Sequence, residues 1–113
     1  MAQVRFDVLR SVAFGGISGT YAVLGSALSF PARMFKITNN TNGDLFISTD
    51  GTNNMLFVPA GGFTLYDCST NAANVKVTDN FLVPNGTQFY VKQSTAPTTG
   101  AVYLEIVYAY GGP

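Results

Sequence analysis

Short runs in which apolar and polar residues alternate recur along this chain, most clearly near its two ends. Residues 4–10 place three apolar side chains on one face and charged side chains on the other. Residues 101–110 are apolar on one face and nearly so on the other, where Glu105 is the one charged residue. A strand of this kind lies in the middle of a sandwich or is covered by another subunit. The period of two predicts β-strands at both ends.

Turn sequences such as Asn42-Gly43 and Asp50-Gly51 separate the runs between these ends, at intervals of roughly ten residues. Further strands are expected over residues 32–38, 45–48, 55–58, 63–67, 75–78, 81–83 and 87–93. No window shows the period of an amphipathic helix. The pattern therefore predicts an all-β fold, a single-domain β-sandwich of jelly-roll or Ig-like type with about 7–8 short antiparallel strands.

Residues 11–30 interrupt the alternation with a Gly- and Ser-rich stretch, in which only residues 21–24 suggest a short strand. We expect an extended N-terminal arm here. The chain then divides into residues 1–30, an N-terminal strand and this arm, and residues 31–113, the sandwich domain. The stretch is too polar for a membrane span and too interrupted for a secretory signal. Deleting residues 1–28 is expected to leave a folded domain that no longer assembles.

The predicted strands indicate which side chains form the core and which contact a neighbouring subunit. The expected core residues are Phe6, Phe35, Ile37, Leu45, Ile47, Phe57, Phe63, Leu65, Phe89, Val91, Leu104 and Ile106. The interface candidates lie in the arm and on the last strand: Phe14, Ile17, Tyr21, Val23, Leu24, Leu28, Tyr103, Val107 and Tyr110. On this hypothesis the terminal strand closes the core with one face, and Tyr103 and Val107 on the other face meet another strand layer or subunit.

Composition strengthens the expectation of assembly. The 113 residues are 47% hydrophobic and only 11% charged, with six basic and six acidic residues that cancel. A soluble domain usually has about 25% charged residues, and a weakly charged surface associates readily. The basic residues are scattered, so no footprint for a phosphate backbone appears. We expect a homo-oligomer with neither nucleic acid nor membrane as a partner.

Candidate chemistry is sparse, because the chain has no histidine and one cysteine, Cys68. Ser-His-Asp and Cys-His arrangements, a zinc site of thiolates and imidazoles, and an intrachain disulfide are therefore excluded. An intermolecular disulfide through Cys68 stays open. Asp44 and Asp50 lie in turn sequences, where Asp caps its own backbone. Glu105 is expected to face solvent or to pair with Lys92. The sequence predicts no enzyme, no catalytic or metal site and no cofactor.

Three stretches, NNTNGDLFISTDGTNNMLFVPAGGFTLYDCSTN, GTQFYVKQSTAPTTGAVYLEIVYAYG and RFDVLRSVAFGGISGTYAVLG, resemble the small virion structural proteins of tailed bacteriophages. The resemblance covers nearly the whole chain. It implies a non-enzymatic virion subunit, made in the host cytoplasm and repeated many times as a homo-oligomer. Such a subunit decorates or cements the capsid, or belongs to the head-tail connector or the tail, and it docks on major capsid, portal-proximal or tail proteins.

Two other classes of function remain open from the residues alone. A receptor- or carbohydrate-binding β-sandwich would stack sugar rings on exposed aromatic residues, for which the candidates are Tyr90, Tyr103, Tyr108 and Tyr110. That alternative requires several of these rings to lie exposed on one concave face. A hydrolase would require two carboxylates close together in a pocket.

Overall fold

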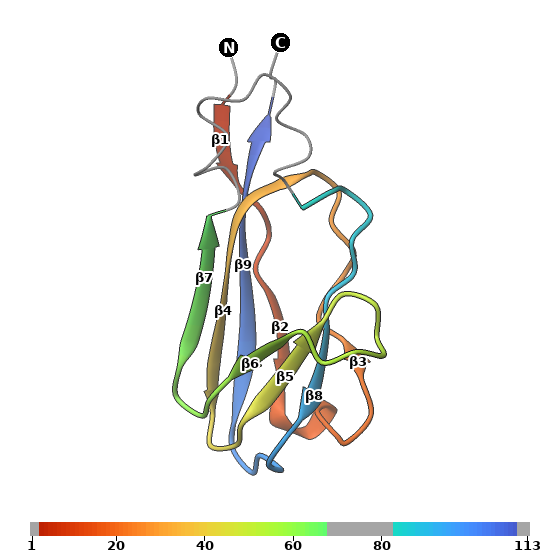
Figure 1. Cartoon of the computed structure of the whole chain (residues 1–113). Helices are drawn as coiled ribbons and strands as arrows, with labels where there is room; N and C mark the ends of the chain where they lie inside the picture. Colours follow the sequence, from red (N-terminus) through yellow and green to blue (C-terminus); the bar gives the residue numbers. More distant parts are fainter. Residues whose placement is uncertain (1–2, 68–82, 111–113) are drawn as a thin grey trace.

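The computed structural model describes residues 3–67 and 83–110, and their regular structure is almost entirely β-strand (Figure 1). The strands are β1 (Gln3–Phe6), β2 (Arg10–Ala13), β3 (Ala22–Val23), β4 (Ala32–Thr41), β5 (Leu45–Ser48), β6 (Leu56–Val58), β7 (Phe63–Asp67), β8 (Tyr90–Gln93) and β9 (Gly100–Tyr110). A single turn of 3-10 helix, η1 (Phe14–Gly16), follows β2. This part of the chain contains no helix long and apolar enough to cross a membrane. The prediction of an all-β fold is confirmed.

The strands form two antiparallel sheets packed as a sandwich (Figure 1). The first sheet has the order β1-β9-β4-β7, with β2 beside β1 along the same edge of β9, and the second has the order β3-β8-β5-β6. The ladders β2·β9, β3·β8, β4·β7 and β5·β6 nest inside one another. A long hairpin rolled into two sheets has this order, which is the jelly-roll arrangement.

The core lies between the two sheets and follows the alternation of the central strands. Many of the expected residues are buried there: Phe35, Ile37, Leu45, Ile47, Phe89, Val91, Leu104 and Ile106. On β9, Val102 is buried beside Leu104 and Ile106, so the prediction that this face closes the core is confirmed.

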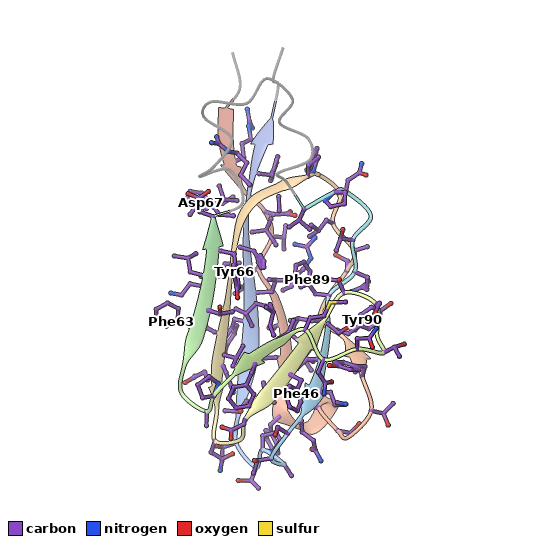
Figure 2. The ribbon with its side chains drawn as sticks, in the orientation of Figure 1. Phe46, Phe63, Tyr66, Asp67, Phe89 and Tyr90 are labelled. Atoms are coloured by element: carbon purple, nitrogen blue, oxygen red, sulfur yellow. The ribbon has the colours of Figure 1, made fainter. Side chains whose placement is uncertain are left out.

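Four expected core residues, Phe6, Phe57, Phe63 and Leu65, are instead more than half exposed. Their strand registers explain the difference. In β7, Phe63 pairs with Thr38 and Leu65 with Lys36, so both apolar side chains share the outward face of the sheet with polar residues of β4. Figure 2 shows Phe63 pointing away from β7 to the outside of the sandwich. Because partners in a ladder share a face, one strand's own sequence does not decide which face is buried.

The N-terminal segment is part of the sandwich and is not a separate arm. It supplies β2 and β3, which pair with β9 and β8. Ile17, Leu24 and Leu28 are at most 6% exposed and pack within the core. The division into residues 1–30 and 31–113 therefore does not match the structure, because both parts contribute to the same core and the same two sheets.

A buried polar network holds the corner where β4 ends and the chain crosses to β5. Asn39, which is fully buried, donates through Nδ2 to the carbonyl oxygens of Gly43 (2.8 Å) and Val58 (3.0 Å). Its Oδ1 accepts from the backbone N–H (3.0 Å) and the hydroxyl (2.6 Å) of Thr41. Every donor and lone pair of this side chain is used, so the corner has one defined conformation.

The predicted strand over residues 75–78, most of that over 81–83, and Cys68 lie outside the described residues. Val83 forms a single bridge with Ala32.

Candidate interaction surface

The outer face of the first sheet carries an apolar surface with two charged residues at its centre. A shallow groove of about 340 Å³ is lined there by Phe6, Leu9, Met34, Leu65 and Val107, together with the charged residues Asp7, Lys36 and Glu105. Phe63 borders it on β7 through its contact with Lys36. The exposed fractions are 83% for Phe6, 61% for Phe63 and 53% for Leu65. Large apolar side chains with so much surface in water are available for contact with another molecule.

Strand registers bring these residues together from distant parts of the sequence. Lys36 on β4 lies directly opposite Glu105 on β9 and opposite Leu65 on β7. Phe6 on β1 lies opposite Val107. Since opposed residues in an antiparallel ladder point to the same side of the sheet, all five side chains are on the outer face.

The two central charges lie side by side, and neither is neutralised by the other. The Nζ atom of Lys36 lies 4.8 Å from the centroid of the Phe63 ring, a cation–π distance. Glu105 is exposed and forms no ion pair with any residue that the structure describes. The groove therefore contains Lys36 and the carboxylate of Glu105, while its third charged residue, Asp7, is ion-paired with Arg10.

Lys92, which the sequence offered as a partner for Glu105, belongs to the second sheet. Its Nζ atom lies 4.8 Å from the ring of Tyr21 and 5.8 Å from that of Phe46. The expected cross-strand pair was wrong because β9 has β4 as its neighbour, and β8 is in the other layer. The other expectation for Glu105, a solvent-facing side chain, is confirmed.

The outer face of the second sheet is also rich in apolar side chains. Val23 on β3 is 54% exposed and Phe57 on β6 is 52% exposed. The rings of Phe46 and Phe57 are packed with their centroids 5.6 Å apart, as expected for residues directly opposite in the β5·β6 ladder. Both outer faces of this sandwich thus present apolar groups to water.

The interface candidates fall into three groups. Ile17, Leu24 and Leu28 are buried in the chain's own core, so their assignment to an interface is wrong. The described candidates outside the buried class are Phe14 and Val23, which are exposed, and Tyr21, Tyr103 and Val107, which are partly buried. Their contact with another subunit stays a prediction. The side chain of Tyr110 lies outside the described part of the structure.

Three of the tyrosines proposed as a sugar-binding platform have described side chains, and these three do not share a face. Tyr103 lies on the outer face of the first sheet, opposite Thr38, whereas Tyr90 belongs to the second sheet. Tyr108 stacks on Phe30, with ring centroids 4.3 Å apart and planes inclined by 5°. The stacking requirement of the carbohydrate-binding alternative is therefore not met by these rings.

Asp50 has a structural role in the turn after β5. Its carboxylate accepts the backbone N–H groups of Asn53 and Thr52, each at 2.8 Å, and the Ser48 hydroxyl at 2.7 Å. These hydrogen bonds, led by those from the two backbone amides, hold the pKa of the Asp50 carboxyl well below its usual range. Within residues 3–67 and 83–110, no three His, Cys, Asp or Glu residues cluster as metal ligands do.

Comparison with known proteins finds no matching family model and no matching curated protein. Among solved structures, a chain of the Bacillus endospore appendages, a family of disulfide-linked pili, superposes with a TM-score of 0.48 and 13% sequence identity. The superposition covers 96% of this chain and 89% of that chain. This likeness concerns the course of the backbone and transfers no function.

The prediction of a tailed-phage virion subunit is corrected by these comparisons. One solved structure that matches is a chain of a bacterial spore appendage, and no family model or curated protein matches. The stretches that carried the resemblance consist of alternating strands and the Asn-Gly, Asp-Gly and Gly-Gly turns between them. Such sequences occur wherever a β-sandwich is built, so they report the fold and not the biological setting.

Proposed function

We propose that this protein is a non-enzymatic structural subunit that acts by assembling with copies of itself. The observation that carries the proposal is the exposure of large apolar side chains on both outer faces of the sandwich. Phe6, Phe63 and Leu65 project from the first sheet, and Val23 and Phe57 project from the second.

The energetics of burial favour association. Covering a side chain such as Phe or Leu contributes about 1.5–3 kcal/mol relative to leaving it in water. When two copies cover Phe6, Phe63 and Leu65 on each side, the burial free energies of several side chains add up. Their sum offsets the translational and rotational cost of association. The formal net charge of zero adds no long-range repulsion between copies.

The subunit is also well suited to be a rigid unit of assembly. In the described residues, every buried side-chain nitrogen or oxygen has a hydrogen-bond partner. Arg10, only 6% exposed, pairs with Asp7 (3.1 Å) and donates to the carbonyl oxygens of Ser26 (2.8 Å) and Ala27 (3.3 Å). A fully satisfied interior gives the described strands a fixed shape, so association does not require the backbone of these strands to become ordered.

Sedimentation velocity of the purified full-length chain over a wide concentration range tests the proposal. We expect a defined oligomer that dissociates on dilution and persists in moderate salt, because apolar contacts dominate. A chain that sediments as a monomer at every concentration contradicts the proposed function.

A further inference from the structure

We propose that a second copy of this chain docks face to face on the outer face of the first sheet, across a two-fold axis. In this dimer, Lys36 of each copy lies against Glu105 of the other. The inference rests on the proposed function of self-assembly and adds to it the surface, the symmetry and the contacts.

Geometry supplies the first argument. Lys36 and Glu105 are directly opposed on the neighbouring strands β4 and β9. A two-fold axis that runs along the strands, midway between β4 and β9, exchanges the two strand positions when one sheet is laid over its copy. The axis therefore brings each Lys36 over the other copy's Glu105 in two equivalent contacts. An isologous interface of this kind pairs residue i with j and j with i.

The same two-fold axis also brings the apolar side chains around the two charges into contact. Leu65 flanks Lys36 on the β7 side. Residues 7–9 connect β1 to β2 beside Glu105, and Leu9 lines the groove there. The rotation that exchanges the two charges also lays Leu9 of one copy over Leu65 of the other. Stacked sheets lie about 10 Å apart with interdigitated side chains, and the apolar side chains that project around the groove are available for such packing.

Charge complementarity selects this face over the other one. The strands of the second sheet contain one charged residue, Lys92, whose ammonium group is already placed near two aromatic rings. Two copies of that face would bring like charges together. On the first sheet Lys36 lies directly opposite Glu105, which has no ion pair within the described residues, so these two positions are complementary to each other across the two-fold axis.

Burying Glu105 in the dimer interface requires a cation beside its carboxylate. A carboxylate that loses water in an apolar interface without a partner is costly, whereas a matched pair of opposite charges offsets the loss and selects the docking orientation. Glu105 at the centre of the groove therefore favours an occupant that supplies a cation at that position, and Lys36 of a second copy does so.

Charge reversal tests the contact by analytical ultracentrifugation. The variants K36E and E105K should each raise the dimer dissociation constant by about tenfold or more, because each places like charges in both contacts. An equimolar mixture of the two variants should recover a dimer, since one copy then carries two carboxylates and the other two ammonium groups. K92E, the matched reversal on the second sheet, should leave the dimer unchanged, and circular dichroism confirms that each variant is folded.

The outcomes separate this inference from the proposed function. A wild-type oligomer that is unaffected by K36E, or a mixture that does not recover association, overturns the face-to-face dimer and leaves self-assembly standing. If E105K loses association and K92E restores it while K36E does not, the partner surface is the second sheet. That result also overturns the face-to-face dimer. Should either reversal impair folding, the neutral variants K36Q and E105Q must still weaken the dimer. A monomeric wild-type chain contradicts both proposals.

Discussion

Arg10 lies across Gly25, so that a Cβ atom built on Gly25 would come within 2.6 Å of both Cβ and Cγ of Arg10. The absence of a side chain at position 25 lets the buried guanidinium reach the carbonyl oxygens of Ser26 and Ala27. This contact joins the start of β2 to the segment between β3 and β4. It also explains why the Gly-rich stretch, which looks like a flexible arm in sequence, is held within the sandwich.

Replacing Gly25 with alanine should destabilise the protein for two reasons. Gly25 has a φ of 74°, where any L-residue costs about 1–2 kcal/mol, and the methyl group would also displace Arg10. We expect G25A to lower the free energy of unfolding by about 3 kcal/mol or more in urea denaturation. G61A is the matched control, because Gly61 has a φ of 73° but no atom within 4 Å of its Cβ position. Equal losses in the two variants would contradict the role of the Arg10 contact.

Asn39 should be among the most sensitive polar positions in the chain. N39A removes four hydrogen bonds and leaves the buried carbonyl oxygens of Gly43 and Val58 without that donor. Each unsatisfied buried group costs about 1–3 kcal/mol, so we expect a loss of about 3 kcal/mol or more in chemical denaturation. N40A changes the adjacent exposed residue and should stay within about 0.5 kcal/mol of the wild type. A similar small effect for N39A would show that the corner does not depend on the network.

Asp50 should make stability depend on acid pH. Hydrogen bonds depress the pKa of its carboxyl in the folded state, so the folded chain binds this proton less readily than the unfolded chain does. Its stabilising contribution is therefore present above the usual Asp pKa of about 4 and is lost as pH falls below that value. Thermal unfolding between pH 7 and pH 2 should show a smaller acid-dependent decrease in D50N than in the wild type. Parallel curves for the two proteins would refute the assignment.

Deleting residues 1–28 should abolish the fold, contrary to the expectation from sequence. The deletion removes β2, β3 and the buried Ile17, Leu24 and Leu28, which exposes the core-facing side of β9 and β8. Loss of buried Leu or Ile side chains costs about 2–5 kcal/mol each, against a typical total stability of about 5–15 kcal/mol. Circular dichroism should show no cooperative thermal transition. A folded truncated chain would restore the interpretation of this segment as an arm.

The core of the central strands was predictable because their alternation is unambiguous. In β4 and β9, inward residues such as Ile37 and Leu104 are apolar, and their neighbours include Lys36 and Glu105, which must face water. For the edge strands β1 and β7 the same pattern gave a wrong prediction of burial, for a physical reason. Phe6, Phe63 and Leu65 are apolar and correctly spaced, yet they sit on the outer face. A hydrophobic residue on the outer face of an edge strand has the same period as one buried in a core.

The candidate surface was only partly visible in the sequence. Tyr103 and Val107 were placed correctly on the face of β9 that points away from the core. The arrangement of Glu105 opposite Lys36, and not beside Lys92, depends on which strands are neighbours. Residues about seventy positions apart become adjacent only when the long hairpin is rolled into two sheets, because strand order is a property of the whole chain.

The sequence by itself determined that this protein is a β-sandwich, that most of its central strands bury one face, and that its turns lie at the Asn-Gly and Asp-Gly positions, because alternation and turn chemistry are local. Only the tertiary structure decided the jelly-roll order, the burial of Leu24 and Leu28, and the outward direction of Phe6, Phe63 and Leu65. Those features depend on register and on which layer covers which face. Register and layer are settled by packing between segments that are distant along the chain.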